Sequence, residues 1–246
     1  MQEPTIVTIP CFSGAPWELE QLTPLAQRTL RTMRLPEALN DVEAYADFVA
    51  AQVADLKDFV LVGDSFGAVV ALALAVRRPA GLRGLVLSGG FAADPVDSRL
   101  LRVALGVTRL LRGPLYRQGV LRLHAALLAS PHDATGEVPW SQAASRAFFL
   151  PNTPHASYVA RTRAAFAADY RSRLGWVAVP TLILTPEDDR LIGPRAATVL
   201  REGIPDASEV VLPGTGHMFR FTHPRAYAAA IERFLRERVD AGEAVA

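Results

Sequence analysis

Short, almost continuously apolar runs alternate with longer amphipathic segments along this chain of 246 residues. Short runs rich in valine, isoleucine and leucine are typical of parallel strands that are covered on both faces of a sheet. They occupy residues 5–9, 30–35, 59–62, 85–87, 181–184 and 209–212. Helical spacing of apolar side chains is found at 42–56, where Glu43 after Asn40 resembles a capping box, at 68–78, at 194–202 and from 224 onward. This alternation predicts an α/β fold with a doubly wound, mostly parallel sheet.

The middle of the chain departs from the alternation. Residues 91–176 contain no convincing strand; helical patterns at 97–111, 115–128 and 157–174 are joined by proline-containing loops. Strands resume at residue 181, so this segment interrupts a single sheet. We therefore expect a core made of residues 1–90 and 177–246, and a helical cap, residues 91–176, inserted between core strands.

Composition narrows the classes of partner. The 26 Lys and Arg residues nearly balance the 25 Asp and Glu residues, which gives no indication of a nucleic-acid or membrane surface. The single cysteine, Cys11, excludes an internal disulfide and a cysteine-cluster metal site. The first residues lack the pattern of a signal peptide, and no apolar run reaches the roughly 18 residues of a membrane helix. We expect a cytoplasmic protein without nucleic-acid or membrane partners; the oligomeric state is not indicated.

The sequence Gly-Asp-Ser-Phe-Gly at 63–67 lies between an expected strand and an expected helix. It fits the pattern G-x-S-x-G, in which a tight turn presents the serine at the carboxyl edge of the sheet. Small residues on both sides of the serine avoid clashes with the strand and the helix. Ser65 is therefore the candidate nucleophile, whereas an ordinary βα turn with a capping serine is the plainer alternative.

A serine hydroxyl needs a base, and the base needs an acid that orients it. His217 follows the last expected strand in a loop with two glycines, which makes it the leading base. Asp189 follows the strand at 181–184 and is the preferred acid; Asp188 is the second choice and Asp94 a weaker one. The carboxyl ends of parallel strands share one edge, so these side chains should meet there.

The intermediate of such chemistry needs an oxyanion hole. The backbone N–H of Phe66, directly after the serine, is one expected donor. The loop after the first strand supplies the second, with Phe12 preferred and Cys11 as the alternative. Cys11, Trp17 and Phe219 are expected to line the substrate pocket, together with the other nearby aromatic residues Phe66 and Phe221.

Charge is unevenly distributed along the chain. Residues 91–176 contain 11 arginines and five acidic residues, whereas the rest of the chain is net acidic. A basic cap could attract an anionic substrate or an acidic partner such as an acyl carrier protein. Alternatively, the arginines only cover the solvated faces of the cap helices.

These residues resemble the α/β-hydrolase superfamily over nearly the whole chain. Residues 63–67 are similar to its nucleophile elbow, residues 187–192 to its acid loop with the acid at Asp189, and Gly216-His217 to its histidine loop. One departure is Pro10-Cys11, where the family commonly has His-Gly. Serine at the elbow disfavours the dehalogenases and epoxide hydrolases of the family, which carry aspartate there.

The resemblance implies a small-molecule ester or thioester substrate, an acyl-enzyme on Ser65, and no metal or organic cofactor. Carbon–carbon hydrolases and lyases use the same three residues, so they remain alternatives. A ligand receptor or signalling protein with little turnover is an alternative from another class.

Overall fold

The computed structural model describes residues 3–18, 25, 27–96 and 99–241. One sheet of six parallel strands forms its centre, in the order β2-β1-β3-β4-β5-β6. The strands are β1 (Thr5–Ile9), β2 (Leu30–Thr32), β3 (Phe59–Asp64), β4 (Leu82–Ser88), β5 (Thr181–Asp188) and β6 (Ala207–Gly216). The expected α/β fold with a parallel sheet is confirmed.

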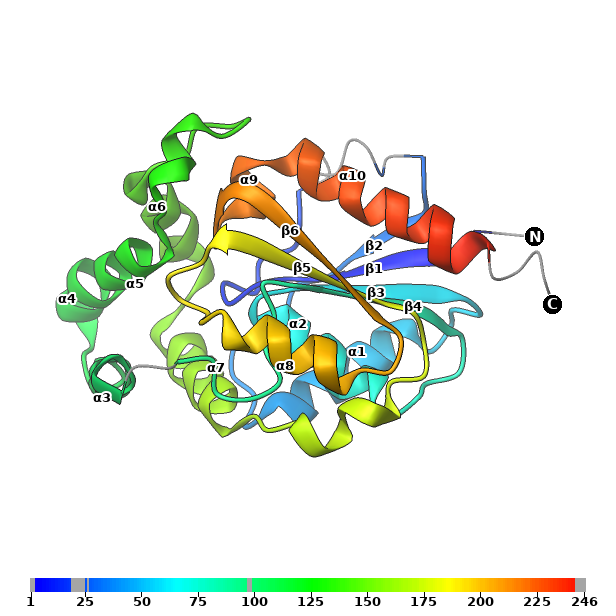
Figure 1. Cartoon of the computed structure of the whole chain (residues 1–246). Helices are drawn as coiled ribbons and strands as arrows, with labels where there is room; N and C mark the ends of the chain where they lie inside the picture. Colours follow the sequence, from blue (N-terminus) through cyan, green and yellow to red (C-terminus); the bar gives the residue numbers. More distant parts are fainter. Residues whose placement is uncertain (1–2, 19–24, 26, 97–98, 242–246) are drawn as a thin grey trace.

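Two layers of helices cover the sheet, and successive strand residues alternate between them. In β3, Leu61 belongs to the apolar cluster beneath one layer, whereas Val60 and Val62 belong to the cluster beneath the other. The first layer contains α1 (Val42–Val53), α2 (Phe66–Ala75) and α8 (Arg195–Gly203), and the second contains α10 (Pro224–Phe234), as Figure 1 shows. Both faces are therefore buried, which explains the continuous apolar runs of the strands.

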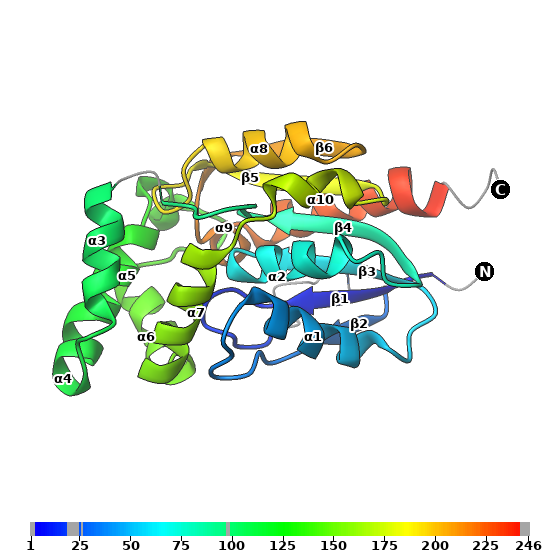
Figure 2. The ribbon, with the colours of Figure 1, turned by 90° about the horizontal axis from the view of Figure 1, so that it is seen from below.

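A group of helices lies in the chain between β4 and β5. It comprises α3 (Arg99–Thr108), α4 (Gly113–Leu115), a π-helical turn (Tyr116–Val120), α5 (Leu121–Leu128), a 3-10 turn (Pro131–Thr135), α6 (Gln142–Asn152), α7 (His155–Ala167) and a 3-10 turn (Arg171–Trp176). Helices α3 to α6 gather beyond the carboxyl ends of the strands, as Figures 1 and 2 show. The helix expected to begin at Asp97 has its first two positions outside the described residues.

Two expectations for this segment are wrong. The loop expected around the prolines contains α6, in which Ser141 caps the N-terminus by accepting from the backbone N–H of Ala144. Pro151 lies in the last turn of α6, where its missing N–H and its bulky ring disturb only the helix end. The helix expected at 157–174 is interrupted because Asp169 forms a β-bridge with Ala93.

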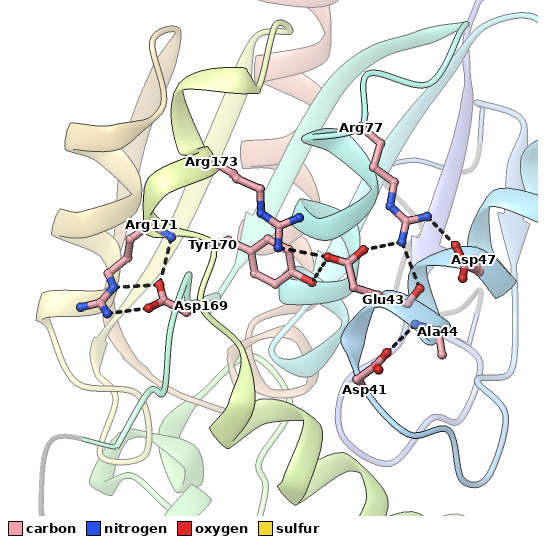
Figure 3. Close-up of polar contacts among 9 residues, drawn as sticks. All are labelled: Asp41, Glu43, Ala44, Asp47, Arg77, Asp169, Tyr170, Arg171 and Arg173. Atoms are coloured by element: carbon pink, nitrogen blue, oxygen red, sulfur yellow. Dashed lines mark hydrogen bonds and ion pairs between the residues drawn. The ribbon is translucent and has the colours of Figure 1, made fainter.

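Glu43 does not cap α1; Asp41 does, accepting from the backbone N–H of Ala44. Figure 3 shows Glu43 instead at the centre of a polar cluster. Its carboxylate accepts hydrogen bonds from Arg77, just beyond α2, and from the hydroxyl of Tyr170 at 3.0 Å, and it forms an ion pair with Arg173 at 3.1 Å. This cluster fastens the segment that returns from the inserted helices to the first helix layer.

Candidate functional site

The turn at Ser65 has a strained backbone. Ser65 has φ 55° and ψ −112°, outside the regions that most side chains adopt. A Cβ at Gly63 would lie 2.4 Å from the carbonyl oxygen of Gly67, and a Cβ at Gly67 would lie 2.3 Å from the carbonyl oxygen of Ile9. Both glycines of the pattern are therefore required by close backbone contacts.

His217 lies directly after β6 and faces the serine. Its Nε2 is 2.9 Å from the Ser65 Oγ, and its Nδ1 is 2.7 Å from Oδ2 of Asp189. All three side chains are largely shielded from solvent. The structure thus brings the predicted nucleophile, base and acid together in one hydrogen-bonded chain.

Asp189 is held in place by its own loop after β5. Its Oδ1 accepts from the backbone N–H groups of Leu191 and Ile192, both at 2.9 Å, which leaves Oδ2 for the imidazole. Asp188, the second choice for the acid, accepts instead from the Ser130 hydroxyl at 3.0 Å. Asp94 accepts a hydrogen bond from the backbone N–H of Val96 and forms an ion pair with Arg102. Its carboxylate is therefore engaged by these two residues and not by the histidine.

The environment of His217 favours its protonated form. Burial opposes the positive charge, but the charge of Asp189 and its hydrogen bond outweigh burial, and Asp64 and Asp133 add to their effect. The pKa of His217 is therefore raised above its ordinary value. A raised pKa suits a group that accepts a proton and then returns it.

The two expected oxyanion donors lie on neighbouring segments, the first turn of α2 and the loop after β1. Phe66 begins α2, and the first N–H groups of a helix have no acceptor within it. The loop after β1 turns at Gly14, whose N–H donates to the Cys11 carbonyl at 2.8 Å, and the rings of Phe12 and Phe66 meet edge to face. Arg161 of α7 donates to the carbonyl oxygen of Phe12 at 2.8 Å and fastens this loop.

A cavity of about 70 Å³ opens beside Ser65. Its wall is mostly apolar and contains no Lys or Arg among the described residues. Cys11 and Phe12 contribute from the loop after β1, as do Phe149 and Tyr158 from the inserted helices and Met218 and Phe221 from the region after His217. Burial and the charge of Asp64 raise the pKa of the Cys11 thiol, so this side chain stays a neutral wall group.

Two pocket predictions are wrong. Trp17 and Phe219 do not line this cavity; both belong to the apolar cluster under α10, where their rings contact Tyr227 at centroid distances of 5.8 and 5.3 Å. Phe219 is only two residues from His217, but α9 (Phe219–Thr222) turns it toward the sheet, whereas Phe221 reaches the cavity.

Four buried polar residues near the site were not predicted. Asp64, next to the serine, forms a 2.8 Å ion pair with Arg220, whose guanidinium also stacks on Trp17 and Phe221. His124 of α5 lines the cavity. Arg161 looked like one of many cap arginines, and its 1% exposure distinguishes it only in three dimensions.

Two other histidines have partners of their own. His223 is 2.9 Å from the Thr222 hydroxyl through its Nδ1, and His155 is 3.2 Å from the Arg109 carbonyl oxygen through its Nε2. Within the described ranges, no three His, Cys, Asp or Glu side chains form a group that could hold a metal ion. No helix in the same part of the chain is both long and apolar enough to cross a membrane.

Curated relatives are similar over most of this chain. A pimeloyl-[acyl-carrier protein] methyl ester esterase of Neisseria meningitidis is 32% identical over 205 residues, covering 79% of this chain and 75% of that protein. A 2-hydroxymuconate semialdehyde hydrolase of Pseudomonas putida is 31% identical, covering 72% of this chain and 62% of that protein. This chain spans just under two thirds of the length of several relatives, 64% for one from Klebsiella pneumoniae.

Solved structures share the fold. A hydrolase from Pseudomonas aeruginosa has a TM-score of 0.80 at 16% identity, covering 95% of this chain and 90% of that one. An enol-lactonase from Burkholderia xenovorans has a TM-score of 0.77 at 19% identity, covering 96% and 92%. The model of the alpha/beta hydrolase family matches residues 6–230. This chain therefore belongs to the α/β-hydrolase family.

Proposed function

We propose that this protein is a serine hydrolase that cleaves small carboxylic esters. The hydrogen-bonded chain from Asp189 through His217 to Ser65, open to an apolar cavity, carries this assignment. The similarity to an esterase that is 32% identical supports it.

In the proposed first half-reaction, Ser65 Oγ attacks the ester carbonyl carbon while its proton moves to Nε2 of His217. The carbonyl π electrons move onto oxygen, and the backbone N–H groups of Phe66 and Phe12 stabilise this oxyanion. When the oxyanion collapses, the carbon–oxygen bond of the leaving alcohol breaks and the alcohol takes the proton from His217. The acyl group is then attached to Ser65.

In the second half-reaction, His217 removes a proton from water, and the resulting hydroxide attacks the acyl carbon. The second tetrahedral intermediate collapses, the bond to Ser65 breaks, and Oγ regains the proton from His217. Asp189 keeps the imidazole in the tautomer with its Nδ1–H toward the carboxylate throughout. A carboxylic acid is released and the site returns to its first state.

The dimensions of the cavity favour short acyl groups. Its volume of about 70 Å³ is less than the ~150 Å³ of an engineered cavity that holds benzene. We propose that residues 91–176 form a cap, since α5 and α7 supply part of the cavity wall. Longer acyl chains then require this cap to move.

Two relatives suggest a second candidate, one for the substrate and one for the reaction. The esterase from Neisseria is named for a carrier-bound ester, so a carrier-bound acyl group is a candidate substrate here. The enzyme from Pseudomonas is named for a semialdehyde that contains no ester, which supports carbon–carbon bond hydrolysis as the other candidate. That compound also carries a carboxylate, and the described cavity wall offers no Lys or Arg to pair with it. Ester hydrolysis therefore fits this cavity better.

The test is burst kinetics on p-nitrophenyl esters of two to eight acyl carbons. We expect multiple turnovers with an optimum at short chains, and a loss of about 10⁴-fold or more in kcat for Ser65→Ala. Ser208→Ala, a serine on β6 away from the cavity, serves as the matched control and should keep full activity. Equal rates for Ser65→Ala and the unmodified protein contradict the proposal, and a single stoichiometric burst without turnover supports a receptor role.

A further inference from the structure

His124 is part of the wall of the Ser65 cavity. It lies on α5, is 6% exposed, and sits among aromatic rings: its centroid is 5.2 Å from that of Phe12, 4.9 Å from Phe149 and 6.0 Å from Tyr158. A phenyl ring makes aromatic contacts of the same kind. Packing alone therefore does not explain why an imidazole occupies this position.

The imidazole has an unsatisfied polar atom. Nε2 of His124 is buried and has no hydrogen-bond partner among the described residues. Other polar groups of the cavity wall are engaged: the Tyr158 hydroxyl accepts from Thr108 at 3.3 Å, and the Cys11 thiol lies 3.4 Å from the Ser13 hydroxyl. A buried polar atom without a partner costs free energy, so it marks a place where a bound molecule can supply the partner.

The imidazole is neutral at physiological pH. Burial, and to a lesser extent the nearby His217, lower the pKa of His124 to about 4. A neutral imidazole has one N–H donor and one lone-pair acceptor. The charged groups at this cavity are Asp64 and the Asp189–His217 pair, and neither attracts a carboxylate to the wall formed by α5. The complementary ligand group is therefore uncharged and forms hydrogen bonds.

His124 does not duplicate the proposed base. His217 already makes the hydrogen bonds to Ser65 and to Asp189, and His124 makes neither. Because His124 and Ser65 line the same cavity, a substrate that reaches Ser65 can also contact His124. A hydroxyl group fits either tautomer of the imidazole, because it can donate to a lone pair or accept from an N–H.

We propose that His124 is a specificity-determining binding residue that hydrogen-bonds a hydroxyl group on the acyl chain of the ester. The preferred substrates are thus short hydroxyacyl esters, not the corresponding alkyl esters. This inference rests on the proposed serine hydrolase function and adds a substrate class to it.

The test compares two methyl esters of equal shape, methyl 3-hydroxybutanoate and methyl 3-methylbutanoate, with methyl 2-hydroxybutanoate as a second position of the hydroxyl. In the unmodified protein we expect kcat/KM for methyl 3-hydroxybutanoate to exceed that for its isostere, methyl 3-methylbutanoate, by about tenfold, the size of one buried hydrogen bond. In His124→Phe this ratio should fall to about one. His124→Gln, which restores a donor and an acceptor, should recover part of the ratio.

His155→Phe is the matched control, because His155 also lies in the inserted segment and contacts a tyrosine ring but does not line the cavity. Its ratio should stay at the value of the unmodified protein. An unchanged ratio in His124→Phe overturns the assignment of His124, even if all esters are hydrolysed.

Binding to Ser65→Ala, measured by calorimetry with the same three esters, separates this inference from the proposed function. If the unmodified protein hydrolyses none of the esters but Ser65→Ala binds the hydroxy ester more tightly, and His124→Phe removes that difference, the binding role stands and the esterase function fails. Equal binding of all three esters overturns the binding role.

Discussion

At the scale of single residues, the site depends on a backbone conformation that is unfavourable by itself. Ser65 has φ 55°, and a non-glycine residue in this region costs about 1–3 kcal/mol. The surrounding contacts hold it there: the Ser65 N–H donates to the Ser88 carbonyl at 2.8 Å, and Gly63 and Gly67 allow the adjoining chain to approach. Strain at this turn is consistent with a residue positioned for function.

The raised pKa of His217 predicts the pH dependence of the reaction. Only the neutral imidazole can take the proton of Ser65, so protonation of His217 stops the reaction. Since its pKa is above the ordinary 6.5, kcat/KM for a neutral ester should fall on the acid side with a midpoint above pH 6.5. The measurement is a pH–rate profile between pH 5 and 9, with circular dichroism to confirm that the protein stays folded.

Asp189→Asn serves as the comparison for this profile. It removes the main source of the raised pKa of His217, so the acid limb of the profile should move to lower pH. It should also lower kcat by about 10⁴-fold, because the imidazole is no longer held in the tautomer that accepts the proton of Ser65. A midpoint below 6.5 in the unmodified protein would contradict the raised pKa of His217.

At the scale of elements, the inserted helices and the loop after β1 are joined through one buried side chain. Arg161 of α7 donates to the Phe12 carbonyl and to the Pro36 carbonyl, both at 2.8 Å, and a Cβ at Gly14 would clash with its guanidinium. The position of α7 therefore affects the peptide that carries the proposed second oxyanion donor.

Arg161→Lys tests this connection. Lysine keeps the charge but cannot reach two carbonyls with a planar fork, so the loop should lose its fixed orientation. Removal of an oxyanion donor costs about 10²–10³ in kcat, so we expect a fall of about tenfold or more from misplacing one, with a smaller change in KM. Steady-state kinetics on p-nitrophenyl acetate measure both constants.

Arg163→Lys is the control, since Arg163 is an exposed residue of the same helix, and its kinetics should not change. If Arg161→Lys raises KM and leaves kcat alone, Arg161 acts on substrate entry and not on the oxyanion loop.

At the scale of the whole molecule, charge and exposed apolar surface are concentrated on the inserted segment. Residues 91–176 have 11 arginines against five acidic residues, although the net charge of the chain is only +1. One face of α3 is apolar and exposed, with Leu100 80%, Val103 64% and Val107 51% accessible, and Leu110, just after the helix, is 78% accessible. An excess of positive charge on this segment would attract an acidic carrier protein, if one delivers the substrate.

If the ester is delivered by an acyl carrier protein, this surface should determine the rate. We expect kcat/KM for a carrier-bound methyl ester to fall about tenfold between low salt and 0.5 M NaCl, because screening weakens attraction between the two proteins. The free methyl ester should show a flat salt profile. Equal salt profiles for the two esters would refute carrier delivery through this surface.

Val107→Asp should lower the rate with the carrier-bound ester, whereas Val211→Asp should not. Both valines are 51% exposed, but Val211 belongs to β6 of the core and is remote from α3 in sequence. If both variants hydrolyse the carrier-bound ester at the same rate, the α3 surface does not take part in binding the carrier protein.

Much of the site could be predicted because its parts are local in sequence. Ser65, Asp189 and His217 each follow directly after a strand, and parallel strands bring their carboxyl ends to one edge whatever the rest of the chain does. The apolar runs identified the strands, including the short β2. The alternation of strands and helices was therefore enough to predict the sheet and to expect these three side chains in one place.

The sequence by itself thus determined the fold class and the residues that meet at the sheet edge, because both follow from periodicity and from chain order. Tertiary structure decided which aromatic rings reach the cavity, since a turn at α9 sends Phe219 to the core and Phe221 to the wall. It also decided which polar groups are buried together: Asp64 and Arg220 are 156 residues apart, and His124 comes from the inserted helices. Burial and pairing depend on distances in space, and no local pattern encodes them.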